Sequence, residues 1–381
     1  MNLHCNDVEI CGNLFNRQTT PRNMQGTVYS HSERENGAIT AVIEFLTAFV
    51  LFLMILTAFL SLAQLEMGSN DPALDRLDGA AVLGMDRISS DGGWFVPIQN
   101  EVLDYDNSTA NWHLFSAKQL DSGRVQAGLI VNGQLNETKI NALHNVSEDG
   151  FAIGIGLHDG YSFHLNIVIT ESSDVQRMGQ VLFDGGTEKH GTRSSSTSYR
   201  YFYQNDETIQ IILEVHDGGR KNNELQITEI HPRPTQFGPE WIEIYNPNNF
   251  AVSLYGWSLT HTSGSSVSNL LLKEGIITGK ATAIFTGDPS SQVTGNASEV
   301  IDLGVEGFLG VGSIDILANG NGQLTLKYTQ VFESRPADIQ RINWGGDSGL
   351  FLINGQSIVW NGTSMFDSAS WSISDQPTPG N

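Results

Sequence analysis

Cysteine and positive charge are scarce in this sequence. Its two cysteines, Cys5 and Cys11, stand near the start, so residues 12–381 can form no disulfide with one another. The Cys-x5-Cys spacing fits no common zinc motif, and we expect both thiols to be reduced. Only 20 Lys and Arg stand against 42 Asp and Glu, a net charge of −22. This balance argues against polyanionic partners and predicts a soluble, self-repelling surface.

Sequence motifs of catalysis are also missing. After the apolar run described below there is no cysteine, no Gly-x-Ser-x-Gly and no His-Glu-x-x-His. Three histidines stand singly, without partners at metal-ligand spacing: His158, His164 and His216. We therefore expect no enzyme, no metal and no cofactor. A hydrolase site assembled from distant residues stays open as a minor alternative.

One long apolar run stands out. Residues 45–63 are uncharged, and the run begins at Ala38. About 20 helical residues cross a hydrocarbon core of about 30 Å, so we predict a transmembrane helix over 38–65 after a segment 1–37. A buried core helix would need a more polar face, and a cleaved signal would have a shorter apolar core nearer the start.

The flanks of this run predict its orientation. Arg17, Arg22 and Arg34 precede it, whereas acidic residues follow it. Positive charge favours the cytoplasmic side, so we expect a single-pass protein of the cell membrane with its C-terminal region outside. The five Asn-x-Ser/Thr sequons agree because all follow the run, and we take them as candidate glycosylation sites: Asn107, Asn136, Asn145, Asn296 and Asn361.

A single acid, Glu44, interrupts the apolar run near its cytoplasmic edge. One interpretation is a side chain that reaches the lipid headgroups. The other uses its neighbours, Gly37-Ala38-Ile39-Thr40-Ala41-Val42-Ile43-Glu44. This stretch resembles the start of archaeal type IV pilin-like proteins. The resemblance implies cleavage between Gly37 and Ala38, and assembly of subunits through Glu44. The leader is longer than usual, and Glu44 would be the seventh residue after the cut rather than the fifth, as in bacterial pilins.

Residues 66–91 predict an amphipathic extension of the helix. An apolar stripe at helical spacing excludes the acids Asp75, Asp78 and Asp86. Asp71-Pro72 gives a start signal, and we expect the end near Ser89. The stripe consists of Leu74, Leu77, Ala81, Met85 and Ile88.

Residues 92–221, here called the middle module, have the periodicity of strands. We predict strands at 151–157, 161–170, 179–183 and 198–215, and a two-residue hairpin turn at Asn132-Gly133. The apolar and turn residues between Ala127 and Ile167 resemble the head of archaeal pilin-like proteins. We therefore expect a β-rich, pilin-like head.

Residues 222–381, the C-terminal module, carry the most specific pattern. It runs acid-Trp-Ile-Glu-hydrophobe-Tyr-Asn-Pro, then Leu-x-Gly-Trp-x-Leu, and closes with Pro-Thr-Pro-Gly. The pattern resembles the lamin tail domain, which implies an immunoglobulin-like β-sandwich. The motif residues are Glu240, Trp241, Glu243, Asn246, Pro247, Gly256, Trp257, Pro379 and Gly380.

These motif residues are expected to specify the fold rather than a reaction. Ile242 and Ile244 alternate with Trp241 and Glu243, which predicts one face toward the core and one outward. Further strands are predicted at 283–285, 300–303, 324–328, 350–353 and 358–360. DNA binding is disfavoured because the module has six Lys and Arg against fifteen Asp and Glu, net −9.

The sequence therefore predicts a mainly-β chain. It consists of a transmembrane helix, a β-rich middle module and an immunoglobulin-like β-sandwich. The leading hypothesis is a membrane-anchored surface protein, in its sharper form a pilin-like subunit, that displays a lamin tail module for adhesion or assembly. Expected partners are the membrane, surface proteins or glycans, and further copies of the chain. The alternative is a monomeric anchored binding protein, accessory to a secreted-polymer system.

Overall fold

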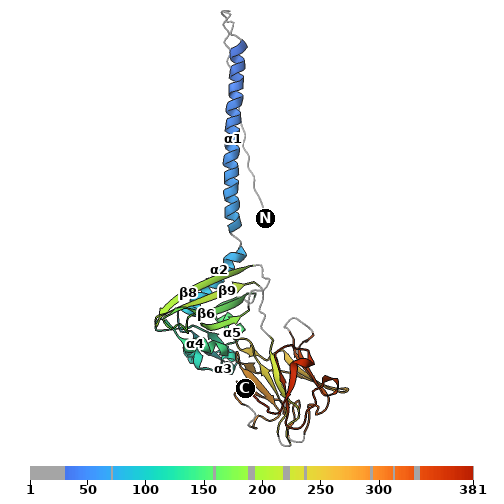
Figure 1. Cartoon of the computed structure of the whole chain (residues 1–381). Helices are drawn as coiled ribbons and strands as arrows, with labels where there is room; N and C mark the ends of the chain where they lie inside the picture. The colour runs from blue at the N-terminus through green and yellow to red at the C-terminus, as the bar shows by residue number, and fades with distance from the viewer. Residues whose placement is uncertain are drawn as a thin grey trace, which may run out of the picture. The chain divides into compact units, whose positions relative to one another are not determined.

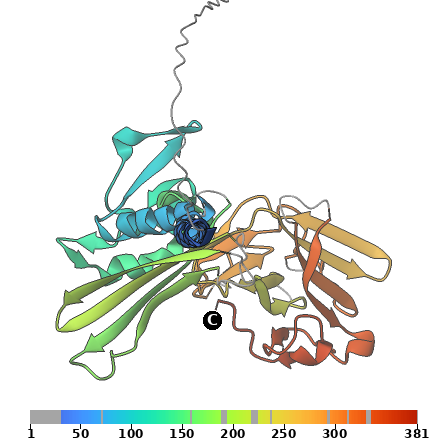
Figure 2. The same cartoon turned by 90° about the horizontal axis from the view of Figure 1, so that it is seen from above.

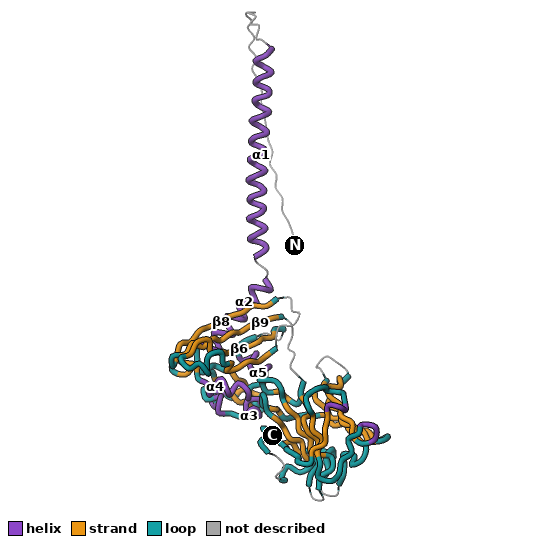
Figure 3. Tube along the Cα trace, viewed as in Figure 1, coloured by secondary structure: helices purple, strands orange, loops and turns teal. Residues whose placement is uncertain are grey.

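A computed structural model describes residues 31–69, 72–157, 160–187, 194–217, 224–235, 238–291, 295–311, 314–329 and 335–380. Within the helices, side chains are described for 40–62 and from 75 onward except at Asp347. Contacts divide the chain into two compact units, residues 1–70 and residues 71–381. Figure 3 shows that the long helices belong to the N-terminal part and that strands dominate the rest. The predicted mainly-β class is confirmed.

The first unit contains one long helix, α1 (His31–Ser69). Its segment Thr40–Leu62 spans 23 residues with a mean hydropathy of 2.6, and none of that stretch is buried by the protein. Thr47 and Thr57, which lie within it, turn their hydroxyls back onto backbone carbonyls of the preceding turn. The helix is therefore long and apolar enough to cross a membrane.

The second unit begins with α2 (Pro72–Ser89), as its start signal and stripe predict. Leu77, Ala81, Met85 and Ile88 are buried, whereas Asp75, Asp78 and Asp86 are exposed. The Leu74 side chain and Asp71 lie outside the described residues. Figure 1 shows α2 against the sheet that contains β8 and β9. The amphipathic prediction is confirmed for the residues that can be checked.

That sheet is the main structure of the middle module. Four antiparallel strands run in the order β7-β6-β9-β8. Their apolar face forms one core with α2, including Phe163, Leu165, Ile209 and Ile211. The strands are β6 (Ser162–Ser172), β7 (Val181–Gly186), β8 (Ser195–Gln204) and β9 (Glu207–His216).

Short elements complete the middle module. β1 (Trp94–Gln99) pairs with β2 (Val102–Leu103) and β3 (Gly123–Gln126), and the predicted Asn132-Gly133 turn joins β4 (Ile130–Val131) to β5 (Gln134–Leu135). The short helices are η1 (Tyr105–Asn107), η2 (Trp112–Leu114), α3 (Ala117–Asp121), α4 (Glu137–Ala142), η3 (Leu143–Asn145) and α5 (Glu148–Gly154).

Two strand predictions in this module need correction. Residues 151–157 were expected to form a strand, but 148–154 are helix α5, whose N-cap Ser147 accepts a hydrogen bond from the Gly150 N–H at 3.1 Å. The acidic first turn after Ser147 also favours a helix start. Residues 198–215 are two strands, because Asn205 and Asp206 adopt φ of 52° and 58° and form a tight turn.

The C-terminal module contains two main sheets. One has six strands in the order β17-β16-β11-β10-β20-β21, and the other has four in the order β14-β13-β18-β19. Figure 2 shows these strands in yellow to red. Apolar side chains from both sheets, such as Ile242, Ile244, Leu259 and Leu326, form one core. This immunoglobulin-like arrangement confirms the predicted sandwich.

The predicted strands of this module agree with the structure, except that 350–353 form a loop. β11 has both faces covered, because Trp241 and Glu243 are as buried as Ile242 and Ile244. The expected outward face of β11 is therefore wrong. The strands are β10 (Gln226–His231), β11 (Trp241–Tyr245), β12 (Val252–Ser253), β13 (Trp257–Ser263), β14 (Ser266–Leu271), β15 (Ile276–Ile277), β16 (Thr282–Thr286), β17 (Glu299–Asp302), β18 (Gly322–Tyr328), β19 (Ala337–Trp344), β20 (Ser357–Trp360) and β21 (Trp371–Ser374), with η4 (Gly346–Ser348) and η5 (Ser368–Ser370) between them.

The loop after β11 joins the two modules. Phe250 packs among Phe151, Phe163 and Phe183 of the middle module. Beside it, the Ala251 N–H donates to the carbonyl of Val146 at 2.9 Å. The middle and C-terminal modules therefore share one apolar core at this point. The predicted boundary at 221/222 falls at residues outside the described ranges.

Candidate functional site

Glu240, the first acid of the C-terminal motif, is fully buried. Its carboxylate accepts hydrogen bonds from the backbone N–H groups of Gly310 at 2.7 Å, Leu317 at 2.9 Å and Ile316 at 3.1 Å. Burial raises the pKa of Glu240 to about 7, and the N–H donors oppose that rise. Glu240 therefore holds the loop between β17 and β18 and has no free acceptor directed at a ligand.

Two further buried carboxylates hold the terminal Pro-Thr-Pro-Gly segment. Glu229 accepts from the Thr378 hydroxyl at 2.9 Å and from the Ser357 hydroxyl. Glu243 accepts from the Gly380 N–H at 2.6 Å and from the Thr228 hydroxyl at 2.5 Å. The C-terminal segment thus lies against the second face of β11 at Glu243, and the His231 ring packs on Trp241 of the same face, with ring centroids 5.4 Å apart.

The other motif residues are also structural. Asn246 donates from Nδ2 to the carbonyls of Phe250 at 2.9 Å and Ile277 at 3.0 Å, and Pro247 follows the end of β11. Gly256 has φ of 87°, which a residue with a side chain adopts only with strain. Trp257 is buried against Tyr328, with ring centroids 4.8 Å apart. The motif specifies a fold, as its pattern predicts.

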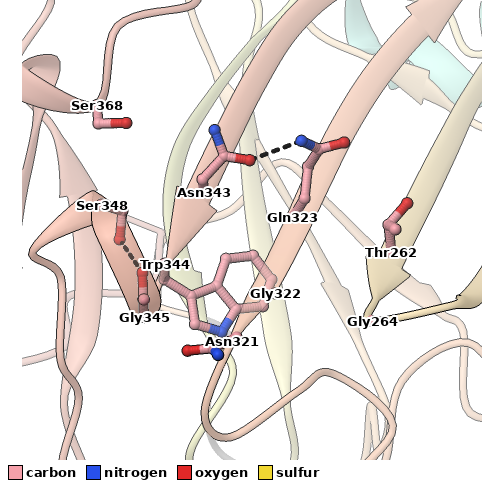
Figure 4. Close-up of a pocket in the computed structure, with 11 residues that line it drawn as sticks. Thr262, Gly264, Asn321, Gly322, Gln323, Asn343, Trp344, Gly345, Ser348 and Ser368 are labelled. Atoms are coloured by element: carbon pink, nitrogen blue, oxygen red, sulfur yellow. Dashed lines mark hydrogen bonds between the residues drawn. The ribbon is translucent and has the colours of Figure 1, made fainter.

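A groove on the four-stranded sheet is the best candidate for a binding site (Figure 4). Thr262 of β13, Gln323 of β18 and Asn343 of β19 are cross-strand neighbours, so their side chains form one row on one face. The groove has a volume of about 460 Å³. Its remaining lining consists of Gly264, Asn321, Gly322, Trp344, Gly345, Gly346, Ser348 and Ser368.

The described side chains that line the groove include amides and hydroxyls and carry no formal charge; the side chain of Asp347 lies outside them. Gln323 donates from Nε2 to Asn343 Oδ1 at 2.7 Å, as the dashed line in Figure 4 shows. In either orientation of this amide pair, one carbonyl group and one amino group take no part in the mutual bond and can meet a ligand. The Thr262 hydroxyl is a further group that can meet a ligand, since it has no hydrogen-bond partner among the described residues. The Trp344 ring lies directly beneath Gly322, and its Nε1 donates to the Ala318 carbonyl at 2.6 Å.

Sequence reasoning did not identify this groove. Its amides come from three strands that are far apart in the chain, and no single motif joins them. The stretch Asn343-Trp344-Gly345-Gly346 was the available signal, since paired glycines after a strand leave a surface open. Gly345 and Gly346 both have positive φ, at 70° and 50°.

A second exposed surface lies on β8, the edge strand of the middle module. Tyr199, Tyr201 and Tyr203 alternate along it and expose 61%, 58% and 75% of their surface. The Tyr201 hydroxyl accepts from Gln210 Nε2 at 2.9 Å, and the Tyr203 hydroxyl donates to Asp206 at 3.2 Å. Such a row of exposed aromatic side chains is typical of contact surfaces between proteins.

The predicted membrane and modification sites lie in different parts of the chain. Gly37, Ala38 and Glu44 all belong to α1. Three sequons are exposed, at Asn107, Asn296 and Asn361. The other two are half-buried and bonded: Asn136 caps α4, and Asn145 donates from Nδ2 to the Phe115 carbonyl at 3.3 Å.

Two of the three histidines noted in the sequence have partners within the protein. His164 Nε2 lies 2.8 Å from Asp184 Oδ1, and His216 Nε2 lies 2.9 Å from the Thr187 carbonyl. His158 lies outside the described residues. In the described ranges, no three His, Cys, Asp or Glu side chains come together to hold a metal ion.

The comparisons identify the C-terminal module. Residues 219–347 match the family model of the lamin tail domain. This match spans β10 to β19, which includes the whole four-stranded sheet and all of the six-stranded sheet except β20 and β21. It agrees with the resemblance seen in the sequence motifs. The search of curated proteins found no match to this chain.

Proposed function

We propose that this chain is a membrane-anchored cell-surface protein that displays its lamin tail domain for adhesion or assembly. The observation that carries the proposal is the Thr40–Leu62 helix, whose side chains are not covered by the protein. In water, such a surface would cost about 25 cal/mol per Å² of exposed apolar area, and a bilayer removes that cost. The lamin tail domain carries a groove lined by amides and hydroxyls, and the middle module carries a row of exposed tyrosines.

The flanking charges support an outward orientation of the displayed domain. Arginines precede the helix, whereas Asp75 and Asp78 follow it. The exposed sequons on the C-terminal side are consistent with the same orientation. The net charge of −22 disfavours nucleic acid as a partner, so surface proteins and glycans are the expected classes.

Protease protection tests the topology. Protease added to intact cells is expected to degrade the lamin tail domain, while an epitope placed before Gly37 stays protected. Permeabilised cells are the matched control, since both parts then become accessible. Protection of the lamin tail domain in intact cells would exclude the proposed orientation.

The pilin-like form of the proposal concerns Glu44. A charged group at the bilayer centre costs about 2.5–3.5 kcal/mol on insertion scales, and less near the interface. Cleavage after Gly37 would free the α-amino group of Ala38. Glu44 of one subunit would then pair with this amino group of a neighbouring subunit, and the pairing would offset the cost of the buried charge. Without cleavage, Glu44 reaches the headgroups and the anchor is monomeric.

Mass spectrometry and self-association separate these two forms. We expect the native chain to begin at Ala38, and Glu44→Gln to associate at least tenfold more weakly than the unchanged chain. Thr57→Ser, a conservative change in the same helix, is the control. An intact segment 1–37 together with unchanged association in Glu44→Gln leaves the monomeric anchored binding protein as the better description.

An extracellular hydrolase is the third hypothesis and has the least support. Glu229, Glu240 and Glu243, the most deeply buried carboxylates of the lamin tail domain, are occupied by backbone and hydroxyl donors. We propose that the protein acts without a cofactor and by binding alone.

A further inference from the structure

We propose that the groove on the four-stranded sheet binds a neutral carbohydrate. This inference deepens the proposed function by naming the class of partner that the lamin tail domain would hold. It starts from the row of Thr262, Gln323 and Asn343 across three neighbouring strands. Because all three positions are in register, the strands fix the spacing of their side chains before any ligand arrives.

The hydrogen-bonding capacity of this row matches sugar hydroxyls. The Gln323–Asn343 pair joins the amino group of one amide to the carbonyl of the other, and it leaves one whole carbonyl and one whole amino group outside that bond for a ligand. A sugar hydroxyl donates and accepts at the same time, so two adjacent hydroxyls complement an amide pair of this kind. The Thr262 hydroxyl, free among the described side chains, extends the row by one more group that does both.

The absence of charge on the described lining side chains selects against ionic ligands. The side chains that face the groove end in amides, hydroxyls or an indole. The chain as a whole carries a net charge of −22, which disfavours sulfated or carboxylated polymers. The described lining side chains offer no carboxylate to a cationic ligand, and the side chain of Asp347, between Gly346 and Ser348, is not among them. A neutral, polyhydroxylated ligand matches the amides and hydroxyls that are described.

The dimensions allow a short saccharide and predict weak binding. The volume of about 460 Å³ falls within the range of about 300–1,000 Å³ that is usual for small-molecule sites. The Trp344 ring is buried beneath Gly322, so it cannot stack on a sugar face. Affinity therefore rests on hydrogen bonds, and many anchored copies on one surface would supply avidity.

An extended peptide is the competing ligand class, since it also offers alternating donors and acceptors. The described lining favours a sugar over a peptide because it offers amides and hydroxyls rather than large apolar side chains, apart from the buried Trp344. Peptide segments also bind by adding a strand to a sheet edge, whereas the row of Thr262, Gln323 and Asn343 crosses the face of the sheet.

Saturation-transfer NMR on the full-length protein tests the proposal. The protein is held in a detergent without a sugar headgroup, and the probes are maltose, cellobiose, mannobiose and N,N′-diacetylchitobiose. We expect transfer to at least one of them and none to hyaluronan fragments. Because micelles have no sidedness, this result does not depend on the membrane orientation tested above.

Two groove variants locate the binding. Thr262→Trp fills the groove, and the double change Gln323→Ala with Asn343→Ala removes both members of the amide pair. We expect each to weaken saccharide binding at least tenfold. Gln134→Ala, which removes an exposed amide of the middle module, is the matched control and should bind as the unchanged chain does.

Melting temperatures distinguish a lost site from a lost fold, and the double alanine variant keeps the test valid if Thr262→Trp does not fold. The proposal is overturned if none of the four disaccharides shows transfer. It is equally overturned if folded groove variants bind as well as the control. Binding of an unstructured polyserine peptide in place of the sugars would assign the groove to the peptide class and also reject the proposal.

Discussion

Replacing Phe250 by alanine tests whether the middle and C-terminal modules fold as one body. Phe250 follows β11 in the lamin tail domain, yet only 2% of its surface is exposed. Its ring centroid lies 5.1 Å from Phe151, 5.6 Å from Phe163 and 5.0 Å from Phe183. All three partners belong to the middle module, so Phe250 inserts a side chain of the C-terminal module into the core of the middle module. A smaller buried cluster of Ala117, Ala251 and Ile276 joins the two modules beside it.

The size of the effect follows from these contacts. Burying a phenylalanine contributes about 1.5–3 kcal/mol, and each aromatic pair adds about 0.5–1.5 kcal/mol. Partial collapse of the cavity recovers some of this loss, so we expect Phe250→Ala to cost about 3–5 kcal/mol. A stability of about 5–15 kcal/mol is typical of folded proteins, so the change removes a large fraction of it.

Differential scanning calorimetry of the full chain in detergent measures this effect. We expect one main transition in the unchanged protein and two separate transitions, both shifted down, in Phe250→Ala. Phe351→Ala removes the same group from a site that is 66% exposed, and it should change stability by less than about 0.5 kcal/mol. If Phe250→Ala melts like Phe351→Ala, the shared core does not exist in solution and our reasoning is wrong.

Two further predictions concern the lamin tail motif. Trp257→Ala should cost about 3–5 kcal/mol because the ring is buried against Tyr328, and an unchanged melting temperature would place this Trp at the surface. Because the pKa of Glu240 is raised from 4.5 to about 7, its contribution to stability is full below about pH 4.5 and is lost as the pH rises to 7. Melting curves between pH 4 and 8 should therefore show that the free energy of unfolding of the unchanged chain, relative to that of Glu240→Gln, falls by on the order of 3 kcal/mol as the pH rises. If this relative stability stays constant or rises with pH, the backbone N–H donors keep Glu240 ionised.

The sequence predicted those features that depend on local periodicity. The stripe of α2 and the alternating strand β6 follow directly from spacings of 3.6 and 2 residues. Helix α5 was mistaken for a strand because Phe151 and Ile155 belong to a short apolar run, and periodicity alone cannot separate a strand from a buried helix there. Ser147, Glu148 and Asp149 together formed the helix-start signal that should have decided between them.

Features made by tertiary contact could not be predicted from the sequence. The groove needs the register of three strands, and a shift of one residue would turn Gln323 to the other face of the sheet. Glu243 of β11 bonds to Gly380 of the C-terminal segment, and Trp241 packs against His231, so the second face of β11 is covered by contacts that periodicity does not show. Phe250 follows a strand end, where a surface loop is the usual expectation, and only the structure shows it inside a neighbouring core.

Three buried glutamates fasten distant segments of a module that contains no cysteine. Glu229 and Glu243 bind residues 378–380, and Glu240 binds residues 310–317, so each links segments that are distant in the chain. A carboxyl group suits this role because its two oxygens can accept from several donors at once, as Glu240 does from three backbone N–H groups. Removing one of these side chains would leave buried donors unpaired, at a cost of about 1–3 kcal/mol for each donor. In a domain without disulfides, these three acids therefore fasten the loops and the C-terminal segment to the sheets, and the groove on the other sheet remains open to a ligand.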